Sequence, residues 1–291
     1  MANYTSHAIM SEQLYNKLIN KNIAKINIDK NALRLFSLGH DLTIINKNCF
    51  NDAHLYSSRR FFIETIKYIR ENNLQNNPIV MSYLYGHISH YALDITIHPL
   101  IDKIIKDEKS KSIIKPHTII ECELDKYLVN RYYNGTYDYS FFKYKYIKSV
   151  KPIINDIYRY VYKYLDVSLI YKSSITLIKF SNLIVQKLYK NDNLFNKISR
   201  INSYEHNSKF YKYTNIDKFL FRKSMDMVLD KSINLSIKLI KETNGYLYEN
   251  KKLERLYNIF DNTPYENIIV EKNYKYNSIP IYSKLNWEFK L

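Results

Sequence analysis

The chain has 291 residues, of which 46% are hydrophobic, so it can bury a sizeable core and its composition excludes an intrinsically disordered protein. Only 4 glycines and 6 prolines are present, fewer than the turns of a sheet-rich fold of this size would use. The two cysteines, Cys49 and Cys122, exclude a disulfide framework and a cysteine-based zinc site. Ile, Leu and Lys recur at helical spacing, so we expect an all-α protein.

The N-terminal residues show no targeting or membrane-spanning pattern. The opening MANYTSHAIMSEQ lacks a charged start followed by an apolar stretch. No run of the chain reaches the roughly 18 apolar residues that a membrane span needs. We therefore expect a cytoplasmic or intracellular protein.

Helical periodicity recurs along most of the chain. Asn51 and Asp52 mark one helix start and Pro78 marks another as a first-turn residue. The segments NNLQNNP and YYNGTYDY predict loops, and the last 40 residues predict irregular or short extended structure. The pattern predicts helices over 6–22, 51–74, 78–97, 110–131, 140–165, 168–190 and 215–243.

Charge and histidine divide the chain differently. Residues 1–125 carry a net charge of +2 and residues 126–291 a net charge of +14, whereas seven of the eight histidines lie in the first 117 residues. We therefore expect a metal-binding core over 1–130 and a helical, basic, Tyr-rich continuation over 131–291, packed together as one compact domain. The basic continuation also favours contact with anionic membrane surfaces.

The stretch GHISHYALDITIHPL combines ionisable residues with an otherwise apolar composition. On a helix with about 100° per residue, His87, His90, Asp94 and His98 fall within roughly 80° of arc. Imidazoles and a carboxylate on one buried stripe need a partner, because an unpaired buried charge costs several kcal/mol. A bound cation would supply that partner. Pro99 follows directly, so we expect the helix to end or kink at His98.

A second stretch, HTIIECELD, repeats the pattern. His117, Glu121 and Asp125 are spaced i, i+4, i+8 on one helical face, and a His–Glu pair one turn apart offers nitrogen and oxygen ligands suited to zinc. Each pair alone is as well explained by ordinary polar contacts, but the two stripes together favour a metal site.

These motifs together match a family. The set TSH at 5–7, LGHD at 38–41, DAH at 52–54, HYALDITIHP at 90–99 and HTIIECELD at 117–125 resembles the bacterial zinc-dependent phospholipase C family over about residues 1–130. The resemblance implies an all-α, multi-helix bundle that encloses two or three zinc ions and hydrolyses phospholipids to diacylglycerol and a phosphorylated head group.

The resemblance also implies which residues bind the metal. One zinc would be held by Asp41, His54, His90 and Asp94, and a second by His98, His117 and Glu121. A third would be held by His7 and Asp94 with help from the N-terminus. Three residues stay open as outer or additional members of the site: His40, His87 and Asp125.

Metal chemistry indicates how such a site would work. Clustered divalent ions clamp the non-bridging oxygens of a phosphate, lower the pKa of a bound water and stabilise the leaving oxygen. Asp41, as ligand or as general base, is the candidate to take the proton of the water.

Two other functions stay open. A related trinuclear-zinc nuclease acting on single-stranded nucleic acid would use the basic half and its 23 tyrosines as a backbone groove with stacking platforms, although no nucleic-acid-binding motif supports it. A non-catalytic interaction protein could keep the metal core for stability alone. The pattern specifies neither a head group nor an oligomeric state.

Overall fold

A computed structural model describes residues 4–55, 58–105, 116–164, 166–189 and 218–260 of the chain. These residues form helices and contain no strand, which confirms the all-α prediction. The elements are α1 (Tyr4–Asn20), α2 (Lys30–Phe36), the 3-10 turn η1 (Gly39–Thr43), α3 (Lys47–Leu55), α4 (Ser58–Glu71), α5 (Pro78–Ile105), α6 (Pro116–Tyr133), α7 (Tyr144–Tyr162), α8 (Val167–Tyr189), α11 (Lys218–Tyr248) and α12 (Glu254–Ile259).

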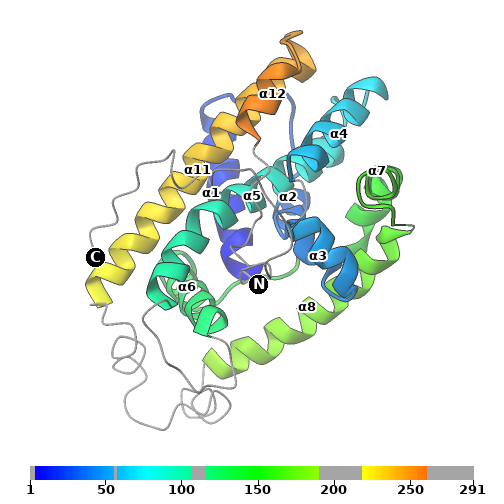
Figure 1. Cartoon of the computed structure of the whole chain (residues 1–291). Helices are drawn as coiled ribbons and strands as arrows, with labels where there is room; N and C mark the ends of the chain where they lie inside the picture. The colour runs from blue at the N-terminus through cyan, green and yellow to red at the C-terminus, as the bar shows by residue number, and fades with distance from the viewer. Residues whose placement is uncertain (1–3, 56–57, 106–115, 165, 190–217, 261–291) are drawn as a thin grey trace, which may run out of the picture.

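Helix α5 is the central element of the fold (Figure 1). It packs against α11, α2, α1, α7 and α6, and nearly every side chain from Val80 to Ile101 is buried. A helix that is apolar on all sides is stable only when other elements enclose it completely. The polar stripe of α5 therefore lies inside the protein.

Several predicted helix bounds need correction. The helix predicted over 51–74 is two helices, with α3 ending at Leu55 and α4 beginning at Ser58. The helix predicted over 78–97, with an end or a kink at His98, does not end there but continues through Pro99 to Ile105. Proline in a helix removes one hydrogen bond and costs about 3 kcal/mol, but neighbouring helices hold α5 on every side.

The sequence analysis missed three short elements. Helix α2 begins after Asp29, whose carboxylate accepts the N–H of Ala32 at 2.8 Å as an N-cap. The turn η1 follows α2 directly. Helix α12 lies in the tail that we expected to be irregular, while 261–291 lie outside the described residues, as do 106–115 at the start of the predicted 110–131 helix.

Two glycines bring α2 and η1 close to α5. A Cβ on Gly86 would lie 2.6 Å from the backbone carbon of Phe36 in α2. Gly39 has a φ of +50°, and a Cβ there would lie 2.3 Å from the ring of His90. Only glycine allows η1 to pass this close to the stripe of α5.

Helix α1 is fixed by a buried ion pair. Glu12 Oε1 lies 2.6 Å from Arg34 Nε of α2, and the hydroxyls of Tyr133 and Tyr137 donate to the same carboxylate. These contacts join α1 to α2 and to the loop after α6. Among the described helices, none is both long enough and apolar enough to span a membrane.

Candidate metal centre

Asp41 and His54 meet at the junction of η1 and α3. Both side chains are buried, and His54 Nε2 lies 3.1 Å from Asp41 Oδ1. The other ring nitrogen of His54, Nδ1, lies 2.8 Å from the carbonyl oxygen of Phe50. Because a carbonyl can only accept, Nδ1 carries a proton, and Nε2 is the ring nitrogen that faces Asp41 and can bind a metal.

His90 and Asp94 repeat this arrangement on α5. His90 Nδ1 donates to the carbonyl oxygen of Ser37 at 3.2 Å, and His90 Nε2 lies 3.2 Å from Asp94 Oδ2. Burial lowers the pKa of His90 well below its usual value, so the ring is neutral near pH 7. The Nε2 lone pair of His90 therefore faces a carboxylate oxygen.

Two acceptors at this distance in a buried site repel each other unless a cation lies between them. In a tetrahedral zinc site with bonds of about 2.0–2.1 Å, neighbouring ligand atoms are about 3.3 Å apart. The two separations of 3.1 and 3.2 Å match that spacing. The donor set of imidazole and carboxylate also suits zinc. The residues therefore fit the metal.

Asp94 faces two histidines at once. Its Oδ1 lies 3.2 Å from His7 Nε2, while its Oδ2 faces His90. Among the described residues, neither ring nitrogen of His7 has a hydrogen-bond partner, so His7 also suits a ligand.

Two groups of ligand atoms could each hold an ion. One consists of His7, His90 and Asp94, and the other of Asp41, His54 and His90; within each group all ligand atoms lie within 4.8 Å of one another. His90 belongs to both groups, but its Nε2 has a single lone pair and binds one ion. A carboxylate has two oxygens, so Asp94 is the residue that can join two ions.

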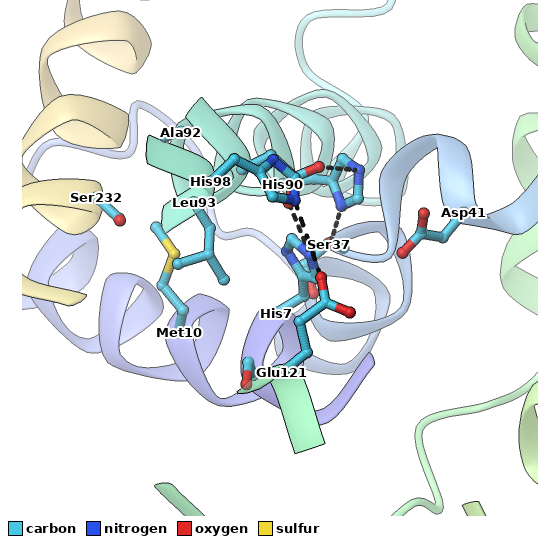
Figure 2. Close-up of polar contacts among 12 residues, drawn as sticks. His7, Met10, Ser37, Asp41, His90, Ala92, Leu93, His98, Glu121 and Ser232 are labelled. Atoms are coloured by element: carbon cyan, nitrogen blue, oxygen red, sulfur yellow. Dashed lines mark hydrogen bonds and ion pairs between the residues drawn. The ribbon is translucent and has the colours of Figure 1, made fainter. Parts of the chain in front are cut away.

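The third predicted set is described only in part. His98 Nε2 lies 3.9 Å from Glu121 Oε1, and both side chains are buried. Figure 2 shows them pointing at each other across the space between α5 and α6, beside His7. His117 lies in the first turn of α6, four residues before Glu121. The structure does not describe the side chain of His117.

His40 and His87 are held by tyrosines. His87 Nδ1 donates to the Tyr83 carbonyl oxygen at 3.1 Å. Burial lowers the pKa of His87 to about 4, so the ring is neutral near pH 7. Its Nε2 therefore accepts a hydrogen bond from the Tyr171 hydroxyl at 3.4 Å. Tyr171 in turn accepts from Tyr158 at 3.0 Å, and Tyr158 accepts from His40 Nδ1 at 2.6 Å. Neither histidine joins the two described groups of ligand atoms.

Asp125 contacts the first turn of α1. Its Oδ1 accepts the backbone N–H of Ser6 at 2.8 Å and also the Ser6 hydroxyl. Burial raises the pKa of Asp125 to about 7. Asp125 therefore anchors the residue next to His7.

Tyr4 is a site residue that the sequence analysis missed. Burial, and after it the charges of Asp41 and Glu121, raise the pKa of Tyr4 well above its usual value. Its side chain therefore lies near carboxylates from two of the predicted ligand sets. A tyrosine in a chain with 30 of them gives no signal that would distinguish it.

A comparison with protein families assigns the chain to one of them. The model of the family described as zinc dependent phospholipase C matches residues 6–170, more than half of the chain. The chain belongs to the zinc-dependent phospholipase C family. No curated protein and no solved structure matches the chain.

Family membership gives the function class. This zinc-dependent phospholipase C is a metal-dependent hydrolase of phosphodiester bonds in phospholipids. The matched range contains every ligand that the sequence motifs predict, and it continues past residue 130 through α7 into the first residues of α8. Tyr158 lies inside the matched range, and Tyr171 is one residue beyond it.

Proposed function

We propose that the buried cluster is the catalytic centre and holds two or three zinc ions. Asp41, His54, His90 and Asp94 would hold one, and His7 with Asp94 another. His98 and Glu121, together with His117, would hold the remaining ion. The observation that carries the proposal is that Nε2 of His54 and Nε2 of His90 each face a buried carboxylate oxygen, at 3.1 and 3.2 Å.

Zinc, when bound, lowers the pKa of water and neutralises the charge on the phosphate. The remaining chemistry belongs to side chains of this protein. Asp41 Oδ1 faces His54, whereas Asp41 Oδ2 has no hydrogen-bond partner among the described residues. Oδ2 would therefore accept the proton of the attacking water.

The surrounding side chains would keep the base and the ligands in position. The carbonyl oxygens of Phe50 and Ser37 fix the tautomers of His54 and His90, as backbone partners commonly do for histidine ligands. The enclosing helices leave Asp41, His54 and Asp94 buried, which excludes bulk water and strengthens the electrostatic interactions inside the site.

The substrate we propose is a phospholipid presented at a membrane surface. The net charge of +14 over residues 126–291 would attract the protein to an anionic surface in a salt-dependent manner. The same charge, together with the 23 tyrosines of these residues, is the basis of the nuclease alternative, so both substrates belong in one experiment.

The test combines two assays on one zinc-loaded preparation. Release of the phosphorylated head group from phosphatidylcholine vesicles and cleavage of single-stranded DNA are measured side by side, before and after zinc chelation. We expect head-group release that chelation abolishes and added zinc restores. DNA cleavage without lipid hydrolysis would favour the nuclease, and neither activity in a zinc-containing protein would favour a metal-stabilised interaction protein.

A further inference from the structure

Helix α8 presents two different faces. Its inner face packs against η1, which carries Asp41, and against α7. Tyr171 on this face is buried and its hydroxyl lies 3.4 Å from His87 Nε2. The inner face therefore contacts His87, which lies on the same helix as the proposed ligands His90 and Asp94.

The outer face carries exposed apolar side chains. Leu169, Leu177 and Phe180 are 55%, 46% and 63% exposed. With about 100° per residue, the three fall within roughly 80° of arc, so they form one stripe along the helix. Tyr144, at the start of the neighbouring helix α7, is also exposed. An exposed apolar stripe marks an interaction surface more often than exposed apolar residues that lie singly.

Positive charge accompanies the stripe. Lys172 and Lys179 lie at nearly the same helical angle, along one edge of the stripe, and both are exposed. Over residues 143–180 there are eight Lys and Arg against two acidic residues, Asp156 and Asp166. Lys172 Nζ lies 5.0 Å from the ring centre of Tyr144, which joins the outer faces of α7 and α8.

An apolar stripe edged by lysines matches the surface of an anionic bilayer. The apolar side chains enter the boundary between head groups and acyl chains, while the lysines lie against the lipid phosphates. The substrate class of this enzyme is a phospholipid, so the protein must approach such a surface to work. In Figure 1 α8 lies at the periphery of the fold.

We propose that the outer face of α8, formed by Leu169, Leu177 and Phe180 with Lys172 and Lys179 at its edge, docks the enzyme onto an anionic phospholipid bilayer. The inference rests on the proposed function and adds to it the surface through which the substrate is reached. Because the opposite face of α8 packs on η1, docking through α8 brings the catalytic centre next to the membrane.

The test compares vesicle binding of the wild type, one triple variant and one double control variant, all of the full chain. In the first, Leu169, Leu177 and Phe180 are each changed to Ser; in the matched control, Ile19→Ser and Met227→Ser change exposed apolar residues on α1 and α11. Co-sedimentation with vesicles of phosphatidylcholine and phosphatidylserine is measured at low salt. We expect the α8 variant to bind at least about tenfold more weakly and the control to bind like the wild type.

A second variant separates charge from apolar contact. Lys172→Glu with Lys179→Glu should weaken binding to anionic vesicles at low salt and leave the weak binding to pure phosphatidylcholine vesicles unchanged. Equal vesicle binding by the wild type and the α8 triple variant would overturn the proposal. A second result would also overturn it: the wild type forms an oligomer, the triple variant is a monomer, and both bind vesicles equally. The outer face of α8 would then bind a second copy of the chain.

Turnover of a short-chain phosphatidylcholine below its micelle concentration distinguishes docking from catalysis. We expect the α8 triple variant to hydrolyse this dissolved substrate at the wild-type rate. If the wild type binds vesicles through α8 but hydrolyses neither substrate, the proposed function fails and the docking surface stands. If it hydrolyses both and the triple variant binds vesicles normally, the docking surface fails alone.

Discussion

Asp125 Oδ1 accepts the backbone N–H of Ser6 at 2.8 Å and so joins α6 to the first turn of α1, one residue before His7. The same oxygen also accepts the Ser6 hydroxyl. His7 Nε2 lies 3.2 Å from Asp94, and this position depends on how the first turn of α1 is held. Asp125 therefore acts on the candidate metal centre through the backbone.

Replacement of Asp125 tests this anchor. Asp125→Leu leaves two buried donors of Ser6 without an acceptor, which should cost about 1–3 kcal/mol in the free energy of unfolding and loosen the zinc held by His7. Asp125→Asn keeps an acceptor oxygen and should retain both stability and metal content. Denaturant unfolding and zinc titration measure the two effects, and a Leu variant with normal zinc content would argue against the anchor.

Metal content should depend more on Asp94 than on His7. Asp94 faces His7 with one oxygen and His90 with the other, so Asp94→Ala removes a ligand from two proposed ions, whereas His7→Ala removes a ligand from one. We expect elemental analysis to find less zinc in the Asp94 variant than in the His7 variant.

Thr96→Ala is the matched control for that comparison, because Thr96 is buried on the same helix and its hydroxyl bonds to Ala92 and Ser232 instead of the cluster. It should keep its zinc. Equal zinc content in the Asp94 and His7 variants would contradict the bridging role of Asp94.

The stability of the zinc-free protein should depend on His87 at acidic pH. Burial lowers the folded-state pKa of His87 from 6.5 to about 4, so the unfolded chain binds more protons between these values. His87 therefore lowers the free energy of unfolding as the pH falls from about 6.5 to 4, by up to about 3 kcal/mol, and has no further effect above 6.5.

Denaturant unfolding at pH 7 and pH 4.5 checks this dependence against His87→Gln, which retains a donor for the Tyr83 carbonyl. The variant should lose less stability between the two pH values than the wild type. An identical loss in both proteins would mean that His87 does not titrate in this range.

The helices and the stripe of α5 could be predicted because both depend on local periodicity. Helical spacing places His87, His90, Asp94 and His98 on one side of any helix, whatever surrounds it. The same reasoning placed the end of the helix too early, because the penalty of Pro99 is local whereas the packing that outweighs it comes from helices distant in sequence.

Other features had no usable local signal. The Asp29 cap could have revealed α2, but a helix of seven residues gives too few turns for periodicity. His40 meets Tyr158 across 118 residues of sequence, and His87 meets Tyr171 across 84. Contacts at such separations depend on the tertiary fold and cannot be read from spacing.

The central claim is that the buried cluster performs the hydrolysis, and phospholipid turnover per zinc-loaded molecule of Asp41→Asn tests it most directly. Asn keeps the shape of the side chain but is a much weaker proton acceptor, so turnover should fall by about 10²–10⁴ while the fold is retained. Asp52→Asn is the control and should keep full turnover. It changes a carboxylate on α3 that accepts a hydrogen bond from the Tyr164 hydroxyl. Zinc content, thermal midpoint and head-group release are measured on the same preparation. An Asp41 variant with full zinc and full turnover would contradict the account.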